Sequence, residues 1–419
     1  MKGTTWLAAC LALVLIILAG CGDTQAPNDF QKKGPTKVKL AAANSRAFQQ
    51  QYGEAIQEQF PDLEIEILEY GGNLTADWLK ENKPDMVYLT AETLETFEQL
   101  VQSNQLMPLE PFIQTSGFPI GDMSPGVVDK LRLMGDGLRL YGLTHSFDSI
   151  VLLYNKSLFE LHEIGLPDDQ LSWEEFWSLI RQFAAKDAYG LDGGSGTSLM
   201  YSLISFMGMS HGLNIVDEDG VPFGDAAWKP LLKQVVDAYA IGAIHPEITS
   251  AEDLERQGRG RSQMPQQFFG GKAAFIFFNA SSIPFVESQI NQNMKVDIGV
   301  APLPVDPNNS GMGEIYINEV FAVPKVSEHP QAGWELINYL CGKTYGVKAK
   351  TNLASVYPDL VREEGRKAPD VVYSIKAVYD DEDIDLTSGV MNSLYQEIGK
   401  VVLKQQSLDE AVANLQKTE

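Results

Sequence analysis

Polar and apolar residues alternate in blocks along residues 141–160. A polar segment that includes Thr144 and Ser146 leads into the apolar run 150–153, and a short amphipathic segment follows. A continuous apolar run that contains β-branched residues is typical of a strand buried on both faces of an α/β sheet. The local pattern therefore predicts a buried strand with a polar lead-in and a helix behind it, and by itself it requires no ligand.

Strand and helix periodicities also alternate from residue 38 to residue 98. Residues 38–42 and 84–89 are apolar enough for buried strands, residues 63–67 alternate apolar with acidic side chains, and helical spacing separates them. This β-α-β-α-β order implies a parallel sheet with right-handed crossovers, and ligands of such sheets bind beyond the carboxyl ends of the strands. The polar residues that follow those ends are Asn44, Thr90 and Glu92.

Two helix starts carry a capping box, in which a serine is followed three residues later by a glutamate. Ser172 and Glu175 form the first box, and Ser407 and Glu410 form the second. After the first box, large apolar residues recur at helical spacing. The sequence therefore predicts an amphipathic helix from about residue 173 and a last helix near the C-terminus.

The first 21 residues resemble a bacterial secretion leader. Lys2 precedes an apolar run at residues 6–18, and Leu18-Ala19-Gly20-Cys21 matches a lipobox, in which the cysteine thiol carries the lipid. The alternative, an ordinary transmembrane helix, needs about 20 apolar residues, and this run is shorter. The prediction is a signal peptide at residues 1–20, then lipidated Cys21 and a polar, flexible tether at residues 21–36.

Length, cysteines and charge narrow the class of protein. The folded part, residues 37–419, is too long for one compact core, so two domains are expected. Cys10 leaves with the leader and Cys21 takes the lipid, so the remaining Cys341 has no disulfide partner and is expected to be a small buried apolar residue. The net charge of −24 disfavours nucleic acid as a partner.

No enzymatic or metal-binding motif stands out. The glycine-rich segment 192–198 has neither the glycine spacing of a dinucleotide or phosphate loop nor the sequence of a nucleophile elbow. It leads into a helix, and the N-terminus of that helix is one possible contact for a ligand oxygen. The five histidines lack metal-ligand spacing. The acidic run 380–383 is typical of a solvated loop rather than of a pair of catalytic carboxylates. We therefore expect no catalysis, no cofactor and no metal.

Several blocks, in order along the chain, resemble one family. Tyr154-Asn155-Lys156 is followed by Gly165-Leu166-Pro167, then LSWEEF at 171–176, GGKAAF at 270–275 and VDIGVAPLP at 296–304. This order resembles the bacterial extracellular solute-binding proteins of family 1, the sugar-binding type. The resemblance implies an α/β, two-lobe periplasmic-binding-protein-like fold of type II, in which each lobe is a mostly parallel sheet flanked by helices. It implies one lobe at residues 37–144 plus 318–365 and a second at 145–317 plus 366–419, joined by hinge crossings.

The same resemblance suggests ligand-binding residues. The stretch ahead of the strand at 150–153 lines the ligand cleft in that family, which points to Asp148 as an acceptor for hydroxyl groups and to His145 as a neutral partner. Asn279 and Tyr316 would reach the ligand from the second lobe, opposite the three polar residues of the first sheet. One departure concerns the sugar: the family's strand commonly ends in glycine and a stacking tryptophan, whereas this one ends in Phe278-Asn279-Ala280.

The resemblance implies a substrate-binding lipoprotein of an ABC importer. Its expected partners are a small solute, most simply a mono- or oligosaccharide, the permease subunits and, through the lipid, the outer face of the cell membrane of a Gram-positive bacterium. The chain is expected to be a monomer. Three alternatives remain at this stage: the same fold with a polyamine, metal ion, thiamine or organic anion as ligand, a receptor that feeds a membrane sensor, and a secreted hydrolase.

Overall fold

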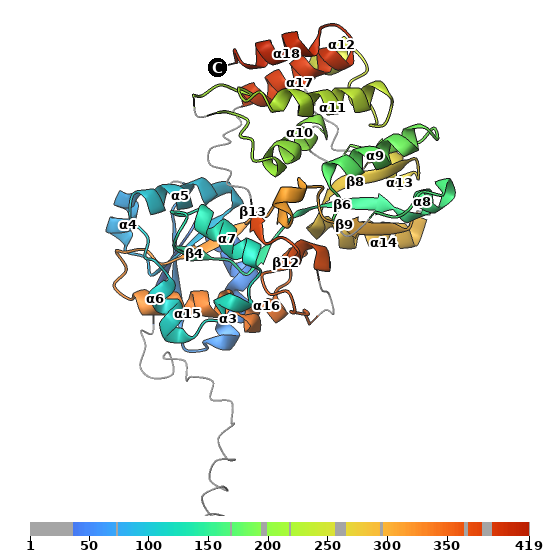
Figure 1. Ribbon diagram of the computed structural model, residues 1–419. Helices are drawn as coiled ribbons and strands as arrows, with labels where there is room; N and C mark the ends of the chain where they lie inside the picture. The colour runs from blue at the N-terminus through green and yellow to red at the C-terminus, as the bar shows by residue number, and fades with distance from the viewer. Residues whose placement is uncertain are drawn as a thin grey trace, which may run out of the picture.

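The computed structural model has two α/β lobes joined by extended crossings (Figure 1). It describes residues 37–72, 74–167, 170–193, 199–217, 219–255, 265–293, 296–363, 368–378 and 388–418. The leader, Cys21, the tether and the acidic run 380–383 lie outside these residues. The expected two-lobe α/β fold is confirmed.

Lobe 1 is built on a five-stranded sheet in which β1 pairs in parallel with both β2 and β3. The strand order is β2 (Glu64–Glu69), β1 (Lys37–Ala42), β3 (Met86–Thr90), β11 (Glu319–Ala322) and β4 (Gly142–Leu143). The predicted parallel unit is therefore confirmed. β11 returns from lobe 2 and runs antiparallel to β3 and β4, which makes the sheet mixed.

Helices cover both faces of this sheet (Figure 1). The lobe 1 helices are α2 (Ser45–Phe48), η2 (Gln49–Gly53), α3 (Glu54–Gln59), α4 (Ala76–Asn82), α5 (Leu94–Gln102), α6 (Glu110–Ser116), α7 (Pro125–Leu133), α15 (Pro330–Leu340) and α16 (Lys343–Lys348). Phe48, Tyr52 and Ile56, which recur at helical spacing, are buried as their period predicts. Cys341 is buried beside α15, as expected for a small apolar residue.

Lobe 2 has a four-stranded sheet, and most of its pairings are antiparallel. Its order is β7 (Tyr189–Leu191), β8 (Ala273–Asn279), β6 (Ile150–Asn155) and β9 (Ile298–Ala301). Only β7 and β8 pair in parallel, so the expectation of a mostly parallel sheet is wrong here. The reason is that β6 enters the sheet at the hinge while β8 and β9 end there, so β6 runs against both neighbours.

β6 is buried on both faces, as its apolar run predicts. Val151 and Leu153 join the same apolar cluster as the core of lobe 1, whereas Leu152, which points to the other face, joins the cluster under the helices of lobe 2. Those helices are α8 (Lys156–His162), α9 (Trp173–Ala184), α10 (Leu199–Ser210), α11 (Trp228–Ala240), α12 (Ala251–Glu255), α13 (Gln266–Phe269), α14 (Ile283–Asn293), α17 (Ser388–Val402) and α18 (Leu408–Leu415). Both predicted capping boxes are present, at the starts of α9 and α18.

Short strands accompany the crossings between the lobes. On the first crossing, β5 (Ser146–Phe147) pairs with β12 (Ala354–Ser355), and on the second, β10 (Met312–Gly313) pairs with β13 (Ala377–Val378). Asp148 and Tyr316 exchange two backbone hydrogen bonds of 2.9 Å, which join the two crossings directly. Among the described residues, no helix is both long and apolar enough to span a bilayer.

Candidate functional site

The strand ends of both lobes meet at the crossings, and we call this region the hinge edge. In lobe 1, the last residue of β3, Thr90, lies opposite the first residue of β11, Glu319. In lobe 2, the last residue of β8, Asn279, lies opposite the first residue of β6, Ile150. The predicted ligand-binding residues other than His145 therefore lie at, or directly after, strand ends of this edge, or on the crossings themselves.

Asp148 is the most heavily bonded side chain of the hinge edge. Its Oδ1 accepts hydrogen bonds from the backbone N–H groups of Ser149 and Ser281, at 2.9 and 3.0 Å. Its Oδ2 accepts from the Ser281 hydroxyl at 2.6 Å and from the Asn279 side-chain amide at 3.2 Å. Four donors thus occupy the four lone-pair positions of a carboxylate.

This environment gives Asp148 a structural role, and the ligand-binding role that the sequence suggested stays a prediction. The side chain is only 6% exposed, and its acceptor positions are filled by the protein. It therefore joins the first crossing to the turn that leads into α14. Asn279 shares in this work, because its amide nitrogen is one of the four donors.

Tyr316 is an exposed aromatic side chain on the second crossing. Its side chain leaves 42% of the residue's surface accessible, while its backbone is fixed to Asp148. Phe285, on the first turn of α14, is 53% exposed, and sequence reasoning missed it. The only signal was its place shortly after the end of β8. Phe278, at the strand end where the family's stacking ring is missing, is buried.

The three polar residues that the sequence predicted in lobe 1 lie at the hinge edge, and they differ in exposure and in hydrogen bonding. Asn44 is exposed, and its Oδ1 caps α2 by accepting from the Ala47 N–H, so its amide N–H groups remain for other partners. Thr90 is half-buried and begins the turn η3 (Ala91–Thr93). Glu92 is exposed in that turn. Together they offer amide, hydroxyl and carboxylate groups.

His145 does not lie on an open surface, and the expectation that it faces the ligand is wrong. Its Nε2 lies 2.6 Å from Glu319 Oε1 and 3.1 Å from the Tyr52 hydroxyl, inside the core of lobe 1. The ring is packed edge-on against Tyr52 and Tyr345. The polar character of a histidine before a strand gave no indication of these distant partners.

Glu319 is the centre of this buried group, which we call the Glu319 cluster: Tyr52, Tyr88, His145, Ser146 and Glu319. The Tyr52 and Tyr88 hydroxyls donate to Oε2, and the Ser146 hydroxyl donates to Oε1. Burial raises the pKa of the Glu319 carboxyl, but attraction to His145 and the hydrogen bonds from His145, Tyr52 and Tyr88 outweigh it, so the pKa lies below its usual value. Burial, together with the Glu319 charge, raises the pKa of Tyr52 well above its usual value.

Two other kinds of site can be checked in the described residues, namely the N-terminus of α10 and a group of metal-binding side chains. The first N–H groups of α10, at Leu199 and Met200, donate to the Glu247 carboxylate, so this helix end does not present them to a ligand. In the part of the chain that the structure describes, no group of three or more histidine, cysteine, aspartate or glutamate side chains is placed to hold a metal ion.

Solved structures share this fold over nearly the whole chain. A family 1 extracellular solute-binding protein from Alicyclobacillus acidocaldarius has a TM-score of 0.69 at 14% identity, covering 92% of this chain and 98% of that one. A sugar transporter protein from Rhizobium etli has a TM-score of 0.65 at 17% identity, and the alignment covers 91% of this chain and 98% of that one. The sugar-binding protein MalE from Xanthomonas citri has a TM-score of 0.64 at 20% identity, and the alignment covers 91% of this chain and 95% of that one. At these identities the likeness shows the fold alone.

The search of curated proteins found no match. The family model described as "Bacterial extracellular solute-binding protein" matches residues 41–346, which is well over half of the chain. The match begins near the end of β1 and includes the other strands of the two main sheets, the crossings that carry Asp148 and Tyr316, and Asn279 at the end of β8. This chain belongs to the bacterial extracellular solute-binding protein family.

Proposed function

We propose that this chain is the lipid-anchored, extracytoplasmic substrate-binding component of an ABC importer and that it binds a mono- or oligosaccharide between its lobes. The observation that carries the sugar assignment is the exposed ring of Tyr316 on the second crossing. Sugar C–H faces pack against aromatic rings, while their hydroxyls need polar groups around the same site. Two relatives of the same fold are described as sugar-binding or sugar-transporting proteins.

The polar groups around Tyr316 suit a neutral polyhydroxylated ligand. Lobe 1 contributes the amide of Asn44, the hydroxyl of Thr90 and the carboxylate of Glu92, and lobe 2 contributes the amide of Asn279. Hydroxyl groups both donate and accept, so they match a set that holds donors and acceptors together. Phe285 supplies a second exposed ring on the lobe 2 side.

In this proposal the ligand acts by favouring a closed arrangement of the lobes. Residues 37–144 plus 318–365 form one body and residues 145–317 plus 366–419 form the other, with the side chains of His145 and Ser146, on the first crossing, packed into the first body. A sugar that contacts both bodies binds the closed form more tightly and so shifts the equilibrium toward it. The closed monomer then docks on the permease and releases the sugar.

The membrane anchor is part of the same proposal. Residues 1–20 act as the signal peptide, Cys21 carries the lipid, and residues 21–36 tether the folded lobes to the outer face of the membrane. Cys21→Ser is expected to move the protein from the membrane fraction to the soluble fraction of cells. Retention of the variant in the membrane fraction would contradict the lipid attachment.

The proposal is tested by thermal unfolding of the soluble chain, beginning at Gly22, against mono- and oligosaccharides, polyamines, thiamine, organic anions and metal ions. A ligand at 100 times its dissociation constant stabilises the folded state by about 2.7 kcal/mol. For a chain of this size that corresponds to a midpoint shift of several degrees. We expect a shift with one or more saccharides.

Matched variants locate the ligand. Tyr316→Ala is expected to abolish the shift and Tyr316→Phe to keep most of it, because the ring matters more than the hydroxyl. Leu161→Ala is the control, since Leu161 is an apolar side chain that is even more exposed than Tyr316 and lies near the end of α8, away from the hinge edge. A shift only with cations, thiamine or anions would mean that the ligand is not a sugar. Co-purification with a sensor kinase instead of a permease would mean that the chain serves a membrane sensor rather than an importer.

A further inference from the structure

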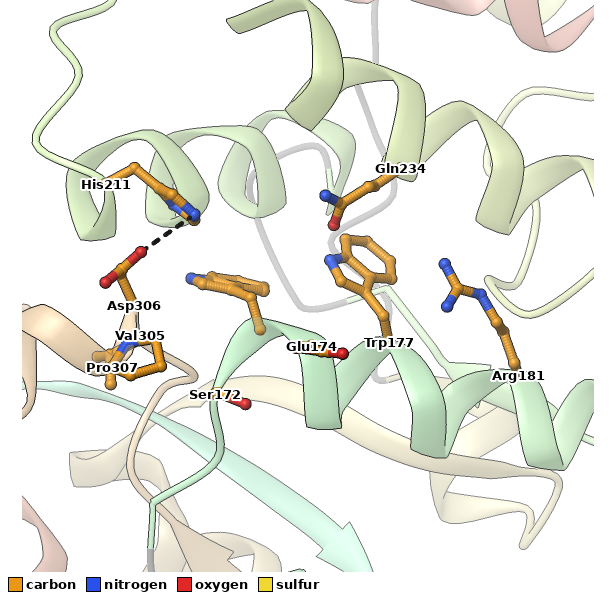
Figure 2. A pocket seen from close by; sticks show the side chains of 10 residues that line it. Ser172, Glu174, Trp177, Arg181, His211, Gln234, Val305, Asp306 and Pro307 are labelled. Atoms are coloured by element: carbon orange, nitrogen blue, oxygen red, sulfur yellow. Dashed lines mark ion pairs between the residues drawn. The ribbon is translucent and has the colours of Figure 1, made fainter. Parts of the chain in front are cut away.

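A pocket of about 460 Å³ opens on the surface of lobe 2 and shares no residue with the hinge edge. It is lined by α9, the end of α10, α11 and the loop that follows β9 (Figure 2). Pockets of roughly 300 to 1,000 Å³ are the usual size for small-molecule sites. The residues that decide its chemistry are Trp173, Trp177, His211, Gln234 and Asp306.

Two indoles of α9 form the floor of the pocket. The capping box at Ser172 begins the helix and places Trp173 and Trp177 one turn apart on the same face, with ring centroids 6.2 Å apart. The Trp173 indole N–H donates to the Ser210 hydroxyl at 2.9 Å. One indole of the pair is therefore fully satisfied by the protein.

The Trp177 indole N–H is the exception. Trp177 is 2% exposed and its nitrogen is shielded from water, yet it has no acceptor among the described residues. A buried donor without a partner costs about 1 to 3 kcal/mol, which folded proteins rarely tolerate without a reason. Figure 2 shows this nitrogen turned toward the pocket, beside the side chain of Gln234. Gln234 is half-buried on α11 and is the pocket side chain beside this nitrogen.

The opposite side of the pocket offers acceptors. His211 Nδ1 lies 2.7 Å from the Met207 carbonyl oxygen, which only accepts, so Nδ1 carries a hydrogen and Nε2 is the ring nitrogen that is left for other partners. Nε2 lies 3.7 Å from Asp306 Oδ2. Asp306 Oδ1 already accepts from the backbone and side-chain nitrogens of Asn308, which leaves Oδ2 toward the pocket. Figure 2 shows His211 and Asp306 facing Trp177 and Gln234 across the space.

We propose that this pocket is a second binding site, which takes a small polyhydroxylated molecule such as a sugar or a polyol. A ligand hydroxyl donates to Asp306 Oδ2 or His211 Nε2, and another accepts from the Trp177 N–H. Hydroxyl groups supply both roles without bringing a charge beside Asp306. The ring edges of the two indoles border the C–H surface of such a ligand.

The test uses the indole N–H resonances of the ¹⁵N-tryptophan-labelled chain beginning at Gly22. Five of the six tryptophans remain in that chain, and Trp177→Phe identifies the resonance of Trp177. Glucose, galactose and mannitol are titrated to about 50 mM, which detects dissociation constants into the millimolar range. Acetate and choline serve as anionic and cationic probes. We expect the Trp177 resonance to move downfield with a hydroxylated probe, saturably, while that of Trp78 in lobe 1 stays in place.

Two variants separate this site from the hinge edge. Asp306→Asn keeps the acceptor for Asn308 but replaces Oδ2 by a donor, and it is expected to weaken the titration at least fivefold. Tyr316→Ala is expected to leave the titration unchanged, even though it removes the proposed sugar site. No shift of the Trp177 resonance, a shift only with acetate or choline, or a shift lost in Tyr316→Ala would each overturn the proposal.

Discussion

Two buried carboxylates hold the crossings, one for each lobe, and they do so with different partners. Asp148 binds two backbone N–H groups, a serine hydroxyl and an asparagine amide. Glu319 binds two phenols, an imidazole and a serine hydroxyl. The Asp148 partners lie on a turn at the edge of lobe 2, whereas the Glu319 partners are rings in the core of lobe 1. Lobe 1 therefore holds its end of the hinge by side chains packed in its core, and lobe 2 holds its end by backbone and side-chain hydrogen bonds at a turn.

The largest effect is expected from Glu319→Ala. The change leaves Tyr52, Tyr88 and His145 with unpaired polar groups in the core of lobe 1. Each buried polar group that is left without its hydrogen-bond partner costs about 1 to 3 kcal/mol, and here several are left together. Urea unfolding of the soluble chain measures the loss, with exposed Glu92→Ala as the control. A loss no greater than that of the control would mean that the Glu319 cluster does not hold lobe 1 together.

Asp148→Ala is expected to have a smaller and more local effect. The change removes the acceptor for the Ser149 and Ser281 N–H groups. The free energy of unfolding is expected to fall by about 1 to 3 kcal/mol, because these groups are left unsatisfied. Hydrogen exchange at the Ser281 amide is expected to accelerate more than exchange in the core of lobe 1. Asp148→Asn, which keeps one acceptor oxygen, is expected to be intermediate. Equal acceleration throughout both lobes would contradict a local role at the hinge edge.

These two carboxylates also show how far sequence reasoning reached. The strand over the apolar run 150–153, the capping boxes, the parallel unit of lobe 1 and the two-lobe fold followed from local periodicity and from the order of motifs. The side-chain partners of Asp148 and Glu319 did not, because most lie more than 130 residues away along the chain. An aspartate before a strand has the same local pattern whether it binds a ligand or closes a turn. His145 was misplaced for the same reason.

The pairing of the lobe 2 strands was missed for a different reason. The direction of a strand depends on where the chain enters the sheet, and β6 enters from the other lobe. Periodicity within the strand carries no information about that entry point. The pocket beside Trp177 was missed too, because helical spacing predicts a buried face but not an unfilled space beneath it.

At acid pH, the stability of the folded protein is expected to depend on the charge of Glu319. The pKa of Glu319 in the folded protein lies below its usual value, so its stabilising contribution is present above about pH 4.3, the unfolded value, and is lost as the pH falls through the lower folded value. Glu319→Gln is expected to flatten the acid side of the stability profile. No corresponding change is expected from Glu92→Gln. An unchanged acid slope in Glu319→Gln would contradict the charged state of the cluster.

The smallest effect is expected at alkaline pH, from the phenols of the same cluster. Burial raises the pKa of Tyr52 well above its usual value, so the unfolded chain loses this proton near pH 10 while the folded chain keeps it. The contribution of Tyr52 is therefore complete below about pH 10 and declines as the pH rises beyond it. Tyr52→Phe is expected to unfold with a shallower alkaline decline, measured by urea titrations between pH 8 and about pH 11. The matched change Tyr316→Phe, at an exposed ring of the hinge edge, is expected to leave the alkaline profile as it is. If both variants flattened it equally, the buried cluster of lobe 1 would not differ from the exposed hinge edge in the way its packing requires.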